Sequence, residues 1–173
     1  MELAIGAMPG SLQQINRLVF QPLDLSISNF ILNKESKEYE ACFFTLNGKN
    51  IIYRLAKITP TKTGQFVTIW KRNENGITVP FDINDDIHFV IIAVTKDDQF
   101  GQFIFPTSVL ADKGIITQSG KEGKRGIRVY PPWDKANNEQ AIKTQVWQSK
   151  YFFLNDFGKN LQSTSEFRKL LDK

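Results

Sequence analysis

The first residues of the chain carry the apolar spacing of a helix. Leu12, Ile15 and Val19 recur three or four residues apart, which places them on one helical face. Ser11 opens a Ser-x-x-Gln sequence of the capping-box type, so we expect it to cap this helix. Pro22 cannot continue a regular helix, and we expect the helix to end there.

Further along the chain, apolar and polar residues alternate as they do in half-buried strands. Asn47-Gly48 separates the first two alternating stretches and is a strong signal for a two-residue hairpin turn. The stretch 86–95 contains the most apolar run of the chain and predicts a central strand buried on both faces. The other predicted strands cover residues 39–46, 50–58, 65–72, 102–105 and 127–130.

Later stretches have helical rather than strand character. Pro106 can open a short helix that reaches about residue 111, and residues 138–153 carry helical spacing. The tail at 163–173 can form a last short helix, while the four glycines of 114–126 predict a flexible connection. Strands and helices in this order predict an α+β fold, a mixed central β-sheet flanked by helices.

Length and composition fit one folded domain. With 173 residues, 41% of them hydrophobic and 12% aromatic, the chain can bury a substantial core. We expect a single domain over 1–173, with its core at about 11–153 and a C-terminal tail at 154–173.

The sequence also bounds the compartment. The single cysteine, Cys42, excludes an internal disulfide and fits a reducing environment. No apolar run approaches the length of a membrane-spanning helix, so we expect a cytoplasmic protein without a membrane partner. Met8 offers an alternative start, which leaves open whether residues 1–10 are native.

The basic residues are concentrated in two parts of the chain, although the net charge is only +4. Residues 49–72 hold six bases and no acid, and residues 113–150 hold eight bases against three acids. A chain with its charges divided in this way can present a strongly positive face despite a modest total.

Common catalytic arrangements are missing from the sequence. His88, the one histidine, opens the most buried strand, where a core or strand-end role is expected. Cys42 lies among phenylalanines and is expected to be a buried thiol. The glycine-rich loop 120–126 fails the phosphate-loop pattern because Glu122 follows Gly-Lys where a hydroxyl is needed. We therefore expect no haem or nucleotide cofactor, and treat 120–126 as a loop able to wrap a phosphodiester backbone.

Bases interleaved with aromatic and amide side chains are typical of proteins that bind single-stranded nucleic acid, where phosphates pair and bases stack. Trp147 shares its helical face with Lys143 and Lys150, and Gln148 could read base edges. The predicted nucleic-acid-binding residues are Arg54, Lys57, Lys62, Lys71, Arg72, Lys121, Lys124, Arg125, Arg128, Trp133, Lys143, Trp147, Gln148 and Lys150.

Five segments together resemble the MepB family. They are YRLAKITPTK at 53–62, GQFVTIWKR at 64–72, GQFIFP at 101–106, GIRVYPPW at 126–133 and KTQVWQ at 143–148. The resemblance extends over about residues 12–153. It implies a fold like that of PD-(D/E)XK restriction endonucleases, and hence RNA or DNA as partner. The family is named for a bacterial operon that also encodes a multidrug efflux pump and its repressor.

Nuclease chemistry on such a scaffold requires a strand-borne acid-x-lysine triplet that helps to hold Mg²⁺. The predicted third strand offers Ile69-Trp70-Lys71, with isoleucine in place of the acid. Asp82 and Asp86, with Lys71, are weak catalytic candidates, and Mg²⁺ is implied only if they act together. The leading hypothesis is therefore a non-catalytic binder that favours RNA or single-stranded DNA over duplex. An active metal-dependent endonuclease, or a module that binds an acidic protein partner, remains open.

Overall fold

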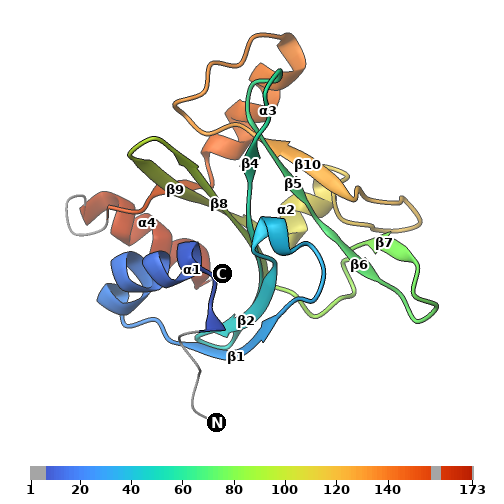
Figure 1. Ribbon diagram of the computed structural model, residues 1–173, viewed down its shortest axis with the longest axis horizontal. Coiled ribbons are helices and arrows are strands. Elements are labelled where there is room, and N and C mark those ends of the chain that lie inside the picture. The colour runs from blue at the N-terminus through green and yellow to red at the C-terminus, as the bar shows by residue number, and fades with distance from the viewer. Residues whose placement is uncertain (1–6, 157–160, 173) are drawn as a thin grey trace.

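The computed structural model describes residues 7–156 and 161–172. Its centre is a six-stranded sheet in the order β1-β2-β3-β8-β9-β11 (Figure 1). β3 and β8 run parallel, and the other neighbouring pairs are antiparallel. The strands are β1 (Ile27–Leu32), β2 (Cys42–Leu46), β3 (Lys49–Leu55), β8 (Phe89–Lys96), β9 (Gln99–Pro106) and β11 (Phe152–Leu154).

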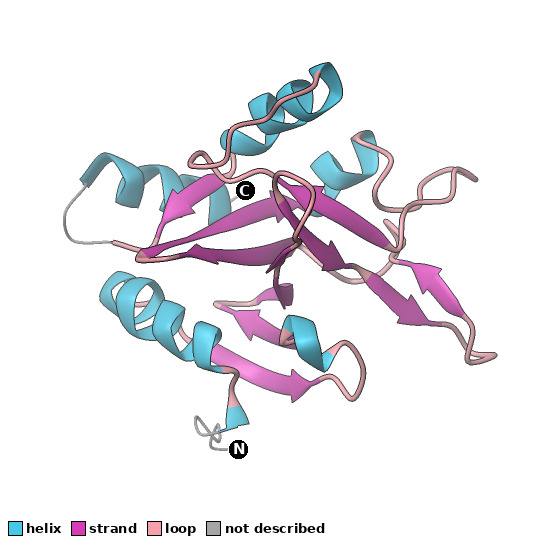
Figure 2. Cartoon of the chain, turned by 45° about the horizontal axis from the view of Figure 1, so that its top comes forward, coloured by secondary structure: helices cyan, strands magenta, loops and turns pink. Residues whose placement is uncertain are grey.

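The two ends of the chain cover one face of this sheet. There α1 (Gly10–Ile15), the π turn η2 (Asn16–Phe20) and the 3-10 turn η3 (Gln21–Leu23) lie beside α4 (Leu161–Leu171) (Figure 1). Figure 2 distinguishes the helices from the strands of the sheet by colour. The rings of Phe20 and Phe167 are 6.4 Å apart between centroids. Leu12, Tyr53 and Ile91 belong to the same buried cluster, so the helical face predicted near the start of the chain packs on the sheet as expected.

The opposite face carries smaller elements. These are η4 (Lys37–Tyr39), β4 (Lys57–Ile58), β5 (Gln65–Thr68), β6 (Trp70–Arg72), β7 (Thr78–Pro80), α2 (Thr107–Asp112), β10 (Gly126–Val129) and α3 (Glu139–Ser149). β10, β5 and β4 form a three-stranded sheet, and β6 pairs with β7. A second buried cluster joins Ile92 of the central sheet to Val67, Leu110 and Val129. The predicted α+β fold with a mixed central sheet flanked by helices is thus confirmed.

Several local predictions are also confirmed. Asn47 and Gly48, with φ of +45° and +81°, form the turn between β2 and β3. β8 lies inside the central sheet, and its first six residues are all buried. Cys42 is a buried free thiol, and burial raises its pKa to about 12. His88 lies just before β8, where its Nδ1 accepts a hydrogen bond from the Asn50 N–H at 2.9 Å.

Two predicted strands are wrong as continuous elements because the chain changes sheets within them. Residues 50–58 divide at Ala56, whose N–H donates to the Ala93 carbonyl at 2.9 Å before β4 joins β5. Residues 65–72 divide at Ile69, whose N–H donates to the Arg125 carbonyl at 2.8 Å before β6 pairs with β7. No proline or glycine lies at either break, so the sequence pattern gives no sign of the change of partner.

The predicted helix boundaries also need correction. α1 starts at Gly10 with no side-chain cap, because the Ser11 hydroxyl lies within the first turn and contacts Glu40 and, at 2.5 Å, the Tyr53 hydroxyl. The helix predicted over 138–153 ends at Ser149, since the next residues turn to place β11 along the edge of β9. Pro22 lies inside η3, one residue before that turn ends.

The glycine-containing segment 114–126 is hydrogen-bonded rather than open. The Lys124 N–H donates to the Ile115 carbonyl at 2.9 Å, and the Gly123 N–H donates to Thr117 Oγ1 at 2.8 Å. Both bonds fold the loop back on the residues that follow α2. Within the described ranges, no helix has the length and apolar character needed to cross a bilayer.

Candidate nucleic-acid interface

A cleft of about 770 Å³ opens between α3, β10 and the turn that joins β4 to β5. Figure 1 shows these elements together at one end of the molecule. The turn contributes residues 61–63, β10 and its flanks contribute residues 124, 126–128 and 130, and α3 contributes residues along most of its length. The two basic stretches that the charge pattern singled out, 49–72 and 113–150, therefore meet around one hollow. We call it the basic cleft.

Four basic side chains line the basic cleft, and no acidic residue of the described chain does. They are Lys62, Lys113, Lys124 and Arg128. Arg128 is held in place, because Nη1 donates to the Thr63 carbonyl at 3.2 Å and Nη2 donates to Thr59 Oγ1 at 2.6 Å. The three lysines are exposed. Unneutralised cations around a concave surface concentrate positive potential there, which favours an anionic ligand.

Aromatic rings complete the lining of the basic cleft. Phe66, Tyr130 and Trp147 all contribute to its walls. Trp147 is half-buried, its ring centroid lies 5.4 Å from that of Phe105, and Lys113 Nζ lies 5.3 Å from its ring centre. Packing on Phe105 fixes the position of the indole, so a rigid aromatic surface and four cations face the same space.

Gln148, predicted to read bases, has a structural role instead. It is buried, its Oε1 accepts the Tyr130 N–H at 2.8 Å, and its Nε2 donates to the Arg128 carbonyl at 3.0 Å. Gln145 similarly donates to the Pro131 carbonyl at 3.0 Å and the Asp134 carbonyl at 2.9 Å. These two amides attach α3 to the chain around β10 and thereby fix the width of the basic cleft.

A second hollow of about 360 Å³ adjoins the basic cleft and shares residues 61–63 with it. Lys96 and Lys135 line it, together with Asp134. Lys96 Nζ lies 3.4 Å from Asp134 Oδ1, so one of the two lysines of this hollow is already paired with an acid. The shared turn makes this hollow a continuation of the positive surface beyond Lys62.

Five of the predicted binding residues line the basic cleft, namely Lys62, Lys124, Arg128, Trp147 and Gln148. Lys113, Tyr130 and Phe66 also line it and were missing from the predicted set. Lys113 lies in the basic stretch at 113–150, which was the available signal for it. Nothing in the sequence pointed to Phe66 and Tyr130, because an aromatic residue in a predicted strand is more often part of the core.

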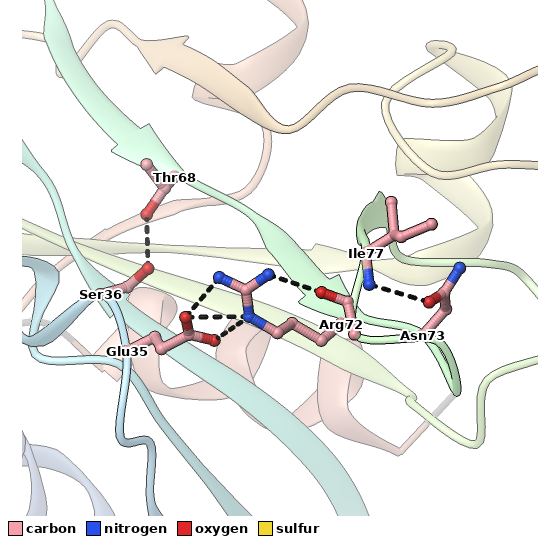
Figure 3. Close-up of polar contacts among 7 residues, drawn as sticks. Glu35, Ser36, Thr68, Arg72, Asn73 and Ile77 are labelled. Carbon is pink, nitrogen blue, oxygen red and sulfur yellow. Dashed lines mark hydrogen bonds and ion pairs between the residues drawn. The ribbon is translucent and has the colours of Figure 1, made fainter.

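Several other predicted residues are engaged elsewhere. Arg72 donates to the Glu35 carboxylate from Nε at 2.8 Å and from Nη2 at 2.6 Å, and its Nη1 donates to the Gly76 carbonyl (Figure 3). The hydrogen bonds from Arg72 lower the pKa of the Glu35 carboxyl. Arg125 donates to the Thr78 carbonyl at 3.0 Å and pairs with Glu122 at 3.0 Å. Both guanidinium groups are therefore largely occupied within the protein.

The remaining members of the predicted set fall outside the basic cleft. Trp133 is half-buried and packs on the Phe152 ring, with 5.7 Å between centroids. Lys143 pairs with Glu139 along α3 at 2.9 Å. Lys57 Nζ lies 5.3 Å from the centre of the Tyr39 ring. Lys121 and Lys150 are exposed, whereas Arg54 is almost completely enclosed in the protein at 1% exposure.

The weak catalytic candidates do not form a metal centre. Lys71 pairs with Asp85 at 2.6 Å, an acid that the sequence reasoning overlooked. Asp82 accepts the Asn84 N–H at 2.9 Å, and Asp86 accepts an Asn50 Nδ2–H at 3.1 Å. In the described part of the chain, no three His, Cys, Asp or Glu side chains gather as metal ligands.

Fold and site together define an α+β protein with a basic, aromatic-lined cleft beside its central sheet. The chain belongs to the MepB-like family, whose sequence model matches residues 33–154. A crystal structure of MepB has 34% sequence identity and a TM-score of 0.73, and the alignment covers 85% of this chain and 97% of that one. The family resemblance read from the sequence is thus confirmed.

A bacterial homing endonuclease, I-Ssp6803I, is also similar in structure, with 11% identity and a TM-score of 0.45 over 84% of this chain and 91% of that one. A likeness of that strength transfers neither the fold nor the chemistry of the enzyme. No match was found among curated proteins.

Proposed function

We propose that this protein binds nucleic acid in the basic cleft without cleaving it, and that it favours RNA or single-stranded DNA over duplex. The observation that carries the proposal is the lining of the cleft: four cations and no acid, arranged around Phe66, Tyr130 and Trp147. Spaced cations suit a phosphodiester backbone, and ring faces suit bases. MepB-like membership is compatible with this function but does not establish it.

The preference for single strands follows from where the rings lie. Paired bases keep their faces covered by stacking within the duplex, so they cannot pack on aromatic side chains inside a cleft. Unpaired bases can do so, and stacking of this kind tolerates any sequence. Gln148 and Gln145 are occupied by backbone groups and Asn138 caps α3, which leaves Asn137 and Gln140 as the lining amides that can read base edges. We therefore expect little sequence specificity.

Fluorescence anisotropy with labelled single-stranded RNA, single-stranded DNA and duplex DNA tests this proposal. The two single strands should bind more tightly than the duplex, and affinity should fall as salt rises. Lys124→Glu should weaken binding to every sequence and reduce the slope of log K against log salt by about 0.7. Lys169→Glu on α4, an exposed residue outside the cleft lining, is the matched control and should leave binding unchanged.

The same samples separate the alternatives. Incubation with Mg²⁺ and Mn²⁺ followed by a denaturing gel should leave the strands intact. Metal-dependent cleavage that is lost in Asp82→Ala or Asp86→Ala would establish the nuclease instead. Absence of binding even at low salt would reject the nucleic-acid proposal and leave an acidic protein as the partner of the basic face.

A further inference from the structure

Arg54 lines another cavity, which shares no residue with the basic cleft or with the hollow beside it. This cavity measures about 300 Å³ and lies between β2, β3, β6 and the residues around Asn33. We call it the Arg54 pocket. Arg54 is 1% exposed, and its pKa is lowered to about 10 because burial disfavours the charged form. A volume near 300 Å³ is at the lower end of small-molecule sites.

The guanidinium of Arg54 has no carboxylate to balance its charge in the described chain. Nη1 donates to the Tyr53 carbonyl at 2.9 Å. Nε is enclosed and has no hydrogen-bond partner among the described residues, and no hydrogen bond of Nη2 is found there either. A buried cation is normally paired, because removing it from water is unfavourable unless an anion or several acceptors replace the lost hydration. Arg54 departs from that rule.

Arg72, in the same pocket, shows what the free edge of Arg54 can do. Its Nε and Nη2 hold the two oxygens of Glu35 at 2.8 Å and 2.6 Å (Figure 3). The Nε–Nη2 edge presents two parallel donors that match two oxygens of a carboxylate or phosphate. In Arg54, this is the edge left without a partner.

The rest of the lining indicates the body of the ligand. Phe43, Ile52, Phe81 and Ile87 form apolar walls, and Trp70 adds a flat ring. Exposed residues on the solvent side are Lys34, Glu35 and Arg72. Counting Lys71, the lining has four bases against one acid, a formal +3. An apolar chamber with one guanidinium edge that lacks hydrogen-bond partners suits a compact apolar group that carries one oxyanion.

We propose that the Arg54 pocket binds a small organic oxyanion, a carboxylate or a phosphate monoester attached to a flat apolar body. The Nε–Nη2 edge of Arg54 takes two of its oxygens, and the body lies against Trp70 and the neighbouring apolar side chains. This site is separate from nucleic-acid binding in the basic cleft and does not depend on it.

Thermal unfolding and isothermal titration calorimetry of the full chain test the proposal, with benzoate, phenyl phosphate and the uncharged benzamide as probes. At about 100 times Kd, benzoate or phenyl phosphate should raise Tm by about 5 °C or more, whereas benzamide should not. Inorganic phosphate at the same ionic strength distinguishes an oxyanion site from one that also needs the apolar body. Equal responses to benzoate and benzamide, or no response to any probe, would overturn the proposal.

Three variants locate the effect. Arg54→Met should abolish the response to both anions, and Arg54→Lys should weaken binding at least about tenfold, since lysine keeps the charge but lacks the paired donors. Lys124→Met, in the basic cleft, should bind the anions as the wild type does. Unchanged affinity in Arg54→Lys would contradict the assignment even if Arg54→Met failed to fold.

Discussion

The basic cleft and the Arg54 pocket hold positive charge in opposite ways. In the cleft, three of the four lining cations belong to exposed lysines, which remain hydrated and can shift to follow a flexible polymer. In the pocket, the central cation is enclosed by protein at 1% exposure and fixed to a strand. Exposed charges are screened by salt, and buried charges are screened much less. The basic cleft therefore suits a repeating anion, and the Arg54 pocket suits a single anion.

The largest expected effect is on the cleft. Lys62→Glu with Lys124→Glu places two acids where two cations stood and should weaken single-stranded RNA binding about 100-fold at low salt. Benzoate binding should not change, because neither lysine lines the Arg54 pocket. Anisotropy and calorimetry on the same preparation measure both. Parallel losses at the two sites would mean that the regions are not independent.

A slightly smaller effect concerns the folding of the cleft wall. Gln148→Ala removes two hydrogen bonds between α3 and the chain around β10 and leaves the Tyr130 N–H and the Arg128 carbonyl without these partners. The free energy of unfolding should fall by about 2–3 kcal/mol. Urea denaturation, monitored by circular dichroism, measures this free energy of unfolding. Gln140→Ala, an exposed α3 substitution, is the control and should change it by less than about 0.5 kcal/mol.

Arg54→Met should stabilise the ligand-free protein by about 1–3 kcal/mol at pH 7. Burial lowers the pKa of Arg54 to about 10 in the folded protein, so above that pH the folded state binds fewer protons than the unfolded chain does. The destabilisation caused by the buried charge of Arg54 is therefore complete below pH 10 and decreases as the pH rises above that value. Thermal unfolding at pH 7 should show a higher Tm for the variant. A lower Tm would indicate that Arg54 supports the fold rather than a ligand.

The smallest expected effect is at the surface of α3. Lys143→Ala breaks an exposed pair with Glu139, in which the two side chains are 75% and 83% accessible. Such pairs contribute about 0.3–0.5 kcal/mol. Tm should change by no more than about 2 °C, and RNA affinity should change far less than in Lys124→Glu, because Lys143 lies outside the basic cleft. A loss equal to that of Lys124→Glu would extend the interface along α3.

Much of the fold could be predicted from short-range patterns. The central strand β8, the Asn47-Gly48 turn and the buried face of the first helix each depend on local sequence alone. The breaks at Ala56 and Ile69 could not be predicted, because the chain changes sheets there without a proline or glycine to mark the change. The end of α3 could not be predicted either. The helix stops so that the next residues can pair as β11 with the edge of β9, and the sequence does not show that this edge is available.

The distribution of charge along the sequence predicted the position of the basic cleft better than it predicted the roles of single basic residues. The two basic stretches do meet at one cleft, which the sequence suggested through their shortage of acids. Single bases were less predictable, since Arg72 and Lys71 find acids from distant loops, Glu35 and Asp85. Arg54 was predicted to bind nucleic acid because a basic residue on a strand is normally exposed. Only the packing of β3 shows that its side chain is enclosed.

Photocrosslinking of RNA to the protein shows directly whether nucleic-acid bases lie in the basic cleft. RNA carrying 4-thiouridine, irradiated with the protein and followed by peptide mass spectrometry, reports which side chains touch the bases. Binding in the basic cleft predicts crosslinks at Phe66, Tyr130 or Trp147 that disappear in Lys62→Glu with Lys124→Glu. Crosslinks confined to β1 or α4, or crosslinks that persist in the double variant, would contradict it.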